Sequence, residues 1–236
     1  LGNCVLPGTT DENRLGEPNR DTSLTSGLTR LYPYEGLVTY SRTLEVPRGF
    51  SGKELFLVLE RTKPCTVSVD GKVVGHHDNL LTPQEFRLPG LRPGLHEISL
   101  AVDNSSALFP AEVRSSHAWN ESTQTNWNGV IGKMFIEARD PLHIVSMKIY
   151  PDVGAGNALV RLEIMSPKNS EALLRLSATA APGEDAGAGK SIGRRPGKDI
   201  VLERTARLEK GMNEVSLTVD MGGDFLLWSE FHPHLY

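Results

Sequence analysis

The sequence predicts an all-β protein that consists of two successive antiparallel β-sandwiches. Most of its apolar residues fall in short runs where they alternate with polar residues, and no amphipathic helix pattern lies between these runs. That alternation is the period of a strand with one buried face. Asp70-Gly71 separates two of the runs and predicts a tight hairpin, because a type I′ turn needs positive φ at both central residues. Many short strands joined by turns are typical of a sandwich or jelly roll.

The first half of the chain holds the clearest strand candidates. They lie at 37–46, 53–60, 65–69, 72–77, 96–104 and 133–138. Residues 1–36 show little periodicity and are rich in turn formers. We expect these elements to form one jelly-roll domain over residues 1–139.

The strand pattern restarts at Pro141 with five further candidates. They lie at 142–151, 158–164, 172–178, 200–206 and 213–219. Turn residues separate them, as in an immunoglobulin-like sandwich, which we place at 140–236. The connection 181–198 is rich in Gly, Ala and charged residues, so we expect a flexible excursion. Within it, Lys190-Ser191 resembles the end of a phosphate loop, but Glu184 stands where that loop needs Gly and no helix follows.

Composition narrows the range of partners and compartments. The chain has 236 residues, which is enough for two domains with buried cores. A net charge of -4 with a pI near 6.0 gives no basic footprint for nucleic acid. No apolar run of ~18 residues predicts a membrane span, and the N-terminal residues show no signal peptide, so we expect any such peptide to have been removed. Cys4 and Cys65 are too few for a disulfide framework. Free buried thiols are favoured over a bond between the two, although pairing stays open.

Two acidic or histidine-bearing segments raise the question of a metal. His76 and His77 are adjacent on a predicted strand and therefore point to opposite faces, whereas a catalytic zinc needs three protein ligands. Asp11, Glu12 and Asn13 offer oxygens for a hydroxyl group or a calcium ion. For these three we favour a loop whose side chains cap its own backbone. We expect no metal site and no cofactor.

A series of motifs in fixed order resembles the N-terminal, galactose-binding-like jelly roll of family 2 glycoside hydrolases. This family includes β-galactosidases, β-glucuronidases and β-mannosidases. The matching segments are Tyr40-Ser-Arg-Thr-Leu-Glu-Val-Pro47, Gly52-Lys53, Val69-Asp-Gly-Lys-Val-Val-Gly-His76, Thr82-Pro83, Leu91-Arg-Pro-Gly94 and Ala101-Val-Asp-Asn104. The segment 6–13 resembles the opening strand and loop of the same domain. Asp70 stands where the family usually has Asn, a departure that leaves the turn chemistry intact.

The C-terminal segment extends the resemblance into the second domain. Leu227-Trp-Ser-Glu-Phe-His-Pro-His-Leu-Tyr236 is similar to a signature of the family's immunoglobulin-like domain. In relatives, further strands and then a (β/α)8 barrel with both catalytic carboxylates follow. The resemblance therefore implies a non-catalytic N-terminal portion of a retaining β-glycosidase, with no catalytic residue of its own. It also implies an incomplete second sandwich, which we expect to self-associate or to be covered by its own terminal segment.

Other interpretations of the resemblance remain open. The chain would also suit a stand-alone carbohydrate-binding module, or a structural pair of sandwiches without a sugar site. Asn120-Glu121 matches the pair that carries the family's catalytic acid, but that pair belongs to a barrel strand and here lies in a sandwich loop. Because relatives are often exported, we expect a periplasmic or secreted protein, with the cytoplasm as an open alternative. The sugar and its linkage are not specified, and the missing barrel of the same polypeptide would be the domain's main partner.

The segment from Asn104 to Gly132 is the candidate sugar-facing element. Loops of more than ~12–15 residues within a compact domain are usually functional or disordered, and this composition argues against disorder. Its tryptophans can cover the C–H face of a sugar, and its side-chain amides can reach hydroxyl groups. The predicted sugar-binding residues are Trp119, Gln124, Asn126 and Trp127. Packing of both tryptophans onto the sandwich is an equally weighted alternative, and the acid that many relatives carry is absent from Thr123-Gln124.

Overall fold

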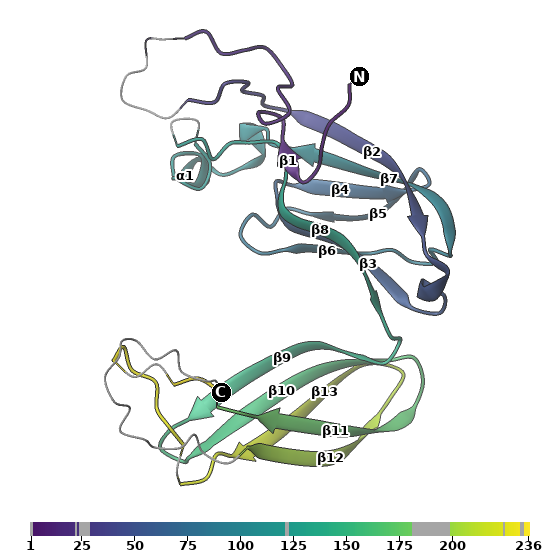
Figure 1. Ribbon diagram of the computed structural model, residues 1–236, viewed down its shortest axis with the longest axis vertical. Coiled ribbons are helices and arrows are strands. Elements are labelled where there is room, and N and C mark those ends of the chain that lie inside the picture. Colours follow the sequence, from purple (N-terminus) through teal and green to yellow (C-terminus); the bar gives the residue numbers. More distant parts are fainter. Residues whose placement is uncertain are drawn as a thin grey trace, which may run out of the picture. The chain divides into compact units, whose positions relative to one another are not determined.

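The computed structural model contains strands throughout and very little helix (Figure 1). It describes residues 2–21, 23, 29–120, 123–180, 199–223, 225–231 and 234–236. The chain divides into two compact units, Leu1–Asp140 and Pro141–Tyr236, and each is described by itself. No helix in the described ranges has the length and hydropathy needed to cross a bilayer.

Unit 1 contains two four-stranded antiparallel sheets. The first has the order β2-β7-β4-β5, and the second has the order β1-β8-β3-β6. The strands of the first sheet are β2 (Leu37–Val46), β7 (Gly94–Asp103), β4 (Cys65–Val69) and β5 (Lys72–His77). Those of the second are β1 (Gly8–Thr9), β8 (Gly129–Arg139), β3 (Glu54–Thr62) and β6 (Gln84–Arg87). The described residues of this unit also form the short helices η1 (Arg48–Phe50), η2 (Ser106–Leu108) and α1 (Ala111–Arg114).

The period-two pattern places the apolar side chains of both sheets in one core. Leu57 and Leu59 of β3, Val67 of β4 and Leu100 of β7 belong to a single buried cluster. Each such side chain stabilises the fold by ~1.5–3 kcal/mol through burial. Both cysteines are free thiols, and burial raises the pKa of Cys65 to about 12.

The hairpin predicted at Asp70-Gly71 is confirmed. Strand β4 pairs antiparallel with β5 across this turn. Asp70 and Gly71 have φ values of 48° and 75°, the left-handed region that a type I′ turn requires at both positions. The Asp70 carboxylate also accepts a hydrogen bond from the Glu97 amide at 2.9 Å, which ties the turn to the neighbouring strand β7.

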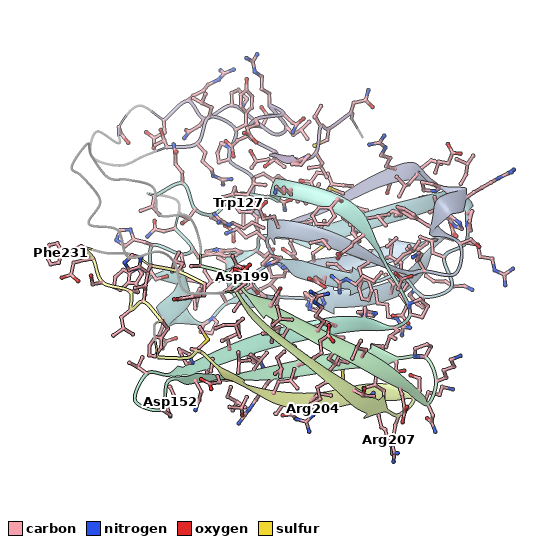
Figure 2. All side chains as sticks on the ribbon, turned by 60° about the horizontal axis from the view of Figure 1, so that its bottom comes forward. Trp127, Asp152, Asp199, Arg204, Arg207 and Phe231 are labelled. Carbon is pink, nitrogen blue, oxygen red and sulfur yellow. The ribbon has the colours of Figure 1, made fainter. Side chains whose placement is uncertain are left out.

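Unit 2 contains a three-stranded sheet of order β13-β10-β9 and a two-stranded sheet, β11-β12. Its strands are β9 (His143–Asp152), β10 (Asn157–Ser166), β11 (Ser170–Ala178), β12 (Ile200–Leu208) and β13 (Gly211–Asp220). Its core joins the inner faces of β10, β12 and β13, with Leu162 and Leu217 among the buried residues. Figure 2 shows Arg204 and Arg207 projecting outward from β12, and Arg207 lies 3.2 Å from the Glu171 carboxylate of β11.

The predicted strands lack one observed element, and some observed strands extend beyond the predicted bounds, as β8 does. The four-residue strand β6 is absent from the candidates, because a run that short has no measurable period. The expected flexible excursion at 181–198, with its phosphate-loop resemblance, lies outside the described residues, as does Glu121.

Candidate functional site

The long segment between β7 and β8 is fastened at both ends by buried asparagines. Asn104 and Asn128 are each 0% exposed. The Tyr40 hydroxyl donates to Asn128 Oδ1 at 2.8 Å, and Asn128 Nδ2 donates to the carbonyls of Gly36 and Val102 at 2.9 and 3.0 Å. Burial raises the pKa of Tyr40, which keeps its hydroxyl a donor. Buried amides paired in this way fix a loop, because leaving any of them unpaired is costly.

The asparagine network continues into the loop itself. Asn104 Nδ2 donates to the Tyr34 carbonyl at 2.7 Å and lies 3.2 Å from Asn126 Oδ1. Gly129, which follows the loop, has φ 137°, and a Cβ there would lie 2.2 Å from the Gly8 carbonyl oxygen. Only glycine permits so close an approach of β1 and β8. The loop therefore enters β8 along a single backbone path.

A buried lysine occupies the centre of the site. Lys63, in the turn between β3 and β4, is 4% exposed. Its ammonium lies 4.1 Å from the centroid of the Trp119 ring and 4.9 Å from that of Trp127. It also donates to the Thr125 carbonyl at 2.6 Å. Such cation–π contacts are worth ~0.5–2 kcal/mol each, so Lys63 holds both rings and the backbone between them.

Trp119 is an interior residue. It is 2% exposed, and its ring packs against Phe109 with centroids 4.0 Å apart and the planes inclined by 34°. Its indole nitrogen is buried without a hydrogen-bond partner in the described structure. The ring therefore forms a layer of the loop's own core.

The tip of the loop is closed by local hydrogen bonds. The Thr125 amide donates to the Asn120 carbonyl at 3.0 Å, and the Asn120 amide donates to Thr125 Oγ1 at 2.8 Å. Gln124 has φ 57°, an uncommon value for a residue with a side chain. Its side chain reaches across to the Thr29 carbonyl at 2.5 Å. Gln124 is exposed and Trp127 is half-buried.

The four predicted binding residues thus divide into two pairs. Asn126, like Trp119, is 2% exposed, so these two side chains are buried in this structure, and contact of any of the four with a sugar stays a prediction. The Lys63 ammonium contacts both tryptophan rings. Asn104 lies within hydrogen-bond distance of Asn126. Gln124 and Trp127 remain accessible. Sequence reasoning missed Lys63 because a lysine next to a proline in a turn carries no local signal of burial.

The segments considered for a metal serve other purposes. His76 Nδ1 lies 2.9 Å from Thr66 Oγ1, and His77 Nε2 lies 3.0 Å from the Glu85 carbonyl oxygen. Within the described ranges, no group of three His, Cys, Asp or Glu side chains could hold a metal ion. Asp11 accepts hydrogen bonds from Arg30 and from the Tyr32 amide.

The neighbouring side chains of the N-terminal loop bind its own backbone. Glu12 accepts from the Thr9 amide at 2.8 Å, and Asn13 accepts from the Val5 amide at 2.7 Å. This is the backbone-capping role favoured for the loop, and it uses the oxygens that a cation would need.

Comparison with known proteins places the fold among enzymes. The sequence matches no family model and no curated protein. Solved structures do match, among them a calcium-binding mutant of Bacteroides uniformis β-glucuronidase 2, with 20% identity and a TM-score of 0.60 over 89% of this chain and 24% of that one. A glycosyl hydrolase family 2 member from Bacteroides cellulosilyticus shows 15% identity and a TM-score of 0.61 over 97% and 28%. A β-D-mannosidase from Dictyoglomus thermophilum shows 13% identity and a TM-score of 0.54 over 77% and 24%.

These matches establish the architecture. At such identities the likeness is one of fold, and it extends over both units. The chain spans about a quarter of the length of the structures it matches. The fold that the motifs imply and the fold of these structures therefore agree.

Proposed function

We propose that this chain is the non-catalytic N-terminal portion of a family 2-type, β-galactosidase-like glycoside hydrolase, and that unit 1 helps to shape the sugar-binding site. The observation that carries the proposal is a fold likeness that continues through both units to structures described as members of that family. The parent enzyme would cleave a β-glycoside with retention, using two carboxylates ~5–5.5 Å apart in a barrel that these units do not contain.

The contribution of unit 1 is the surface formed by Gln124 and Trp127. The exposed part of an indole ring covers a pyranose face with little rotamer entropy to lose. The Gln124 side-chain amide, three residues earlier in the chain, replaces water at a hydroxyl group for ~0.5–1.5 kcal/mol. Lys63 is a positioning residue here, because it contacts Trp127 and the Thr125 carbonyl rather than the sugar.

An assay of the purified chain tests the proposal directly. Nitrophenyl β-galactoside, β-glucuronide and β-mannoside should be hydrolysed at background rates. Turnover that follows the protein peak through a second purification would contradict the non-catalytic assignment. The gene downstream of the Tyr236 codon should encode a barrel that carries the two catalytic carboxylates. A stop codon directly after Tyr236 would contradict the proposal that the chain is part of a larger enzyme.

A sugar titration separates the proposal from its nearest rival. Because most of the pocket would come from the barrel, galactose, glucuronate and mannose should bind the chain at millimolar concentration or not measurably. Saturable binding in the micromolar range would instead favour a stand-alone carbohydrate-binding module.

A further inference from the structure

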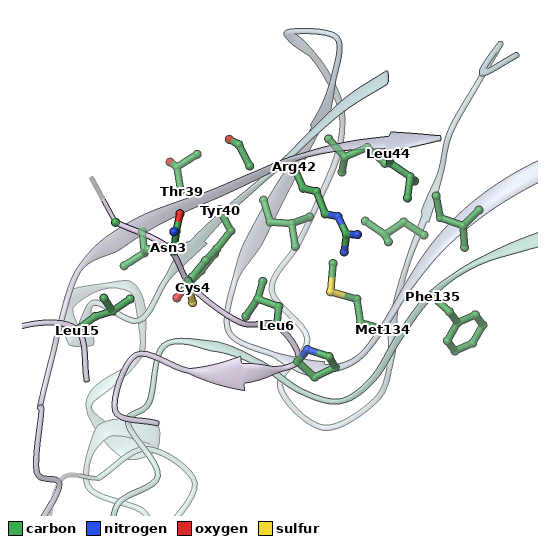
Figure 3. A pocket seen from close by; sticks show the side chains of 18 residues that line it. Asn3, Cys4, Leu6, Leu15, Thr39, Tyr40, Arg42, Leu44, Met134 and Phe135 are labelled. Carbon is green, nitrogen blue, oxygen red and sulfur yellow. The ribbon is translucent and has the colours of Figure 1, made fainter. Parts of the chain in front are cut away.

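The sandwich of unit 1 is open on one side. A cavity of about 610 Å³ lies between strand β2, strand β8 and the N-terminal segment. Figure 3 shows this segment running past the side chains that line the cavity. Ligand sites in proteins usually measure ~300–1,000 Å³, so the cavity has the size of one.

The sheet topology explains why the sandwich is open here. Strand β2 is an edge of its sheet. Strand β1 pairs only with Gly129 and Val130 of β8, so residues 134–136 have β3 as their one neighbour among the described strands. Both β2 and residues 134–136 of β8 thus have one edge without a partner among the described strands, and the N-terminal segment runs past the side chains here (Figure 3).

Most of the side chains that line the cavity are apolar, with Asn3, Thr39 and Ser41 among the polar ones. Leu57, Ile98 and Leu100 form its floor and belong to the buried core, while Met134 and Ile136 are half-buried on β8. Transfer of apolar surface from water to an apolar contact is favourable. The apolar part of this lining therefore suits a ligand with a hydrocarbon body.

One of the residues that line the cavity, Arg42, is charged. On β2, Val38, Tyr40, Leu44 and Val46 face the core at alternate positions, and the same alternation places Arg42 on that face. Arg42 is paired in register with Ile98, and Figure 3 shows its side chain reaching toward Met134. None of the described residues lining the cavity is acidic, and Arg42 has no ion pair within the described part of the chain.

We propose that this cavity binds a small amphiphile with an aliphatic body and a single carboxylate, the carboxylate pairing with the Arg42 guanidinium. Arginine suits this role because its planar donors match the two oxygens of a carboxylate. The body of the ligand lies over Leu100, Met134 and Ile136. The inference does not depend on the proposed function, since every residue that lines the cavity belongs to unit 1.

Cys4 supplies an internal reporter of occupancy. It lines the cavity and is partly exposed, whereas Cys65 is 0% exposed in the core. A ligand in the cavity would therefore slow the reaction of Cys4 with a small maleimide. Cys65 should stay unreactive in the folded protein in both cases.

The test is calorimetric titration of the full chain with sodium decanoate below its micellar concentration, with decan-1-ol as the uncharged analogue. Decanoate should bind at submillimolar concentration and about tenfold more tightly than decanol, a difference of ~1.4 kcal/mol. It should also slow maleimide labelling of Cys4. Arg42→Gln should reduce decanoate binding to the level of decanol, while Arg48→Gln, at an exposed arginine in η1, should leave it unchanged.

A second variant tests the apolar wall. Leu44→Phe narrows the cavity from an edge strand that tolerates a larger side chain, so it should weaken both probes alike. Circular dichroism confirms that each variant is folded. The proposal is overturned if decanoate shows no saturable binding, or if Arg42→Gln and Arg48→Gln bind it as the unchanged chain does. It is also overturned if Arg42→Gln only promotes self-association, which would make Arg42 an inward-pointing charge that guards a sheet edge.

Discussion

The two units are built from similar strands, yet they bury them to different extents. In unit 1, Leu57 and Leu59 are buried, and their cross-strand neighbours Ile136 and Met134 on β8 are half-buried. In unit 2, Leu162 is 4% exposed, whereas its cross-strand neighbour Met147 on β9 is 57% exposed. A four-stranded sheet faces another in unit 1, but only two strands face three in unit 2. Coverage by the second layer, rather than the apolar content of a strand, decides what is buried.

The units also differ in how they hold their turns. Unit 1 fixes its long loop with buried amides such as Asn128, whose side chain makes four hydrogen bonds. Unit 2 uses asparagines close to the surface. Asn213 accepts from the Glu209 amide and donates to the Glu209 carbonyl, each at 2.8 Å, in the turn between β12 and β13. A buried hydrogen-bond network makes a loop more rigid than an exposed one does, because its groups cannot form hydrogen bonds with water instead.

The largest expected change in the free energy of unfolding tests whether coverage by the second sheet decides which side chains are buried. Leu162→Ala should reduce the free energy of unfolding of unit 2 by ~2–5 kcal/mol, because it leaves a cavity in a closed core. Met147→Ala, directly across the sheet, should cost less than about 1 kcal/mol. Urea denaturation of both variants measures the difference. Equal losses would mean that β9 is covered to the same extent as β10.

The second prediction compares the two asparagines. Asn128→Ala leaves the Tyr40 hydroxyl and buried carbonyls without a partner, each at a cost of ~1–3 kcal/mol, so we expect a loss of roughly 2–4 kcal/mol. Asn213→Ala exposes its former partners to water and should cost ~0.5–1 kcal/mol. Denaturation followed by tryptophan fluorescence reports both. A larger loss for Asn213→Ala would contradict the assigned roles.

The third prediction separates contact from packing at the loop surface. In the proposed parent enzyme, Trp127→Ala should lower kcat/KM about tenfold, that is ~1.4 kcal/mol, with little change in melting temperature. Trp228→Ala, at a 61% exposed tryptophan of unit 2, is the matched control and should leave kcat/KM unchanged. A lower melting temperature with unchanged turnover per folded molecule would make Trp127 a packing residue.

The fourth prediction concerns Lys63. Lys63→Met keeps the aliphatic stem but removes the ammonium, and the relief of its desolvation offsets the lost contacts, so stability should change by no more than about 1 kcal/mol. The tryptophan emission should nevertheless shift to longer wavelength, and amide exchange near Thr125 should accelerate. Lys63→Arg should restore both signals in part. Unchanged emission and exchange in Lys63→Met would show that the ammonium does not position the rings.

The smallest effect is a pH dependence at the start of the loop. The Ser106 amide donates to Glu35 Oε1 at 2.6 Å, and hydrogen bonds from Ser106 lower the pKa of Glu35. A carboxyl whose pKa falls on folding stabilises the protein above its unfolded pKa and loses that effect as the pH falls through the folded value. Since Glu35 is exposed, solvent screening limits the gain to less than about 1 kcal/mol. Glu35→Gln should lower the melting temperature slightly at pH 7 and not at pH 3; equal effects at both would contradict it.

The sequence by itself determined the strands, the turn at Asp70-Gly71 and the all-β fold. Each of these depends on neighbouring residues: a period of two sets the buried face, and tolerance of positive φ sets the turn. The limits of β4 and β5 could be predicted to the residue for that reason. The loop before Gly129 was also recognisable, because its length and its tryptophans interrupt the strand pattern.

Only the tertiary structure decided which of the loop residues reach the surface. Lys63 meets Trp119 and Trp127 across more than fifty residues of chain, and Arg42 faces a cavity closed by residues near position 135 and by the N-terminal segment. Such contacts arise from the order in which strands pair and sheets stack. Strand pairing brings distant residues together, but it does not change the sequence pattern of either segment. The burial of Trp119 and Asn126 therefore could not be predicted from the sequence.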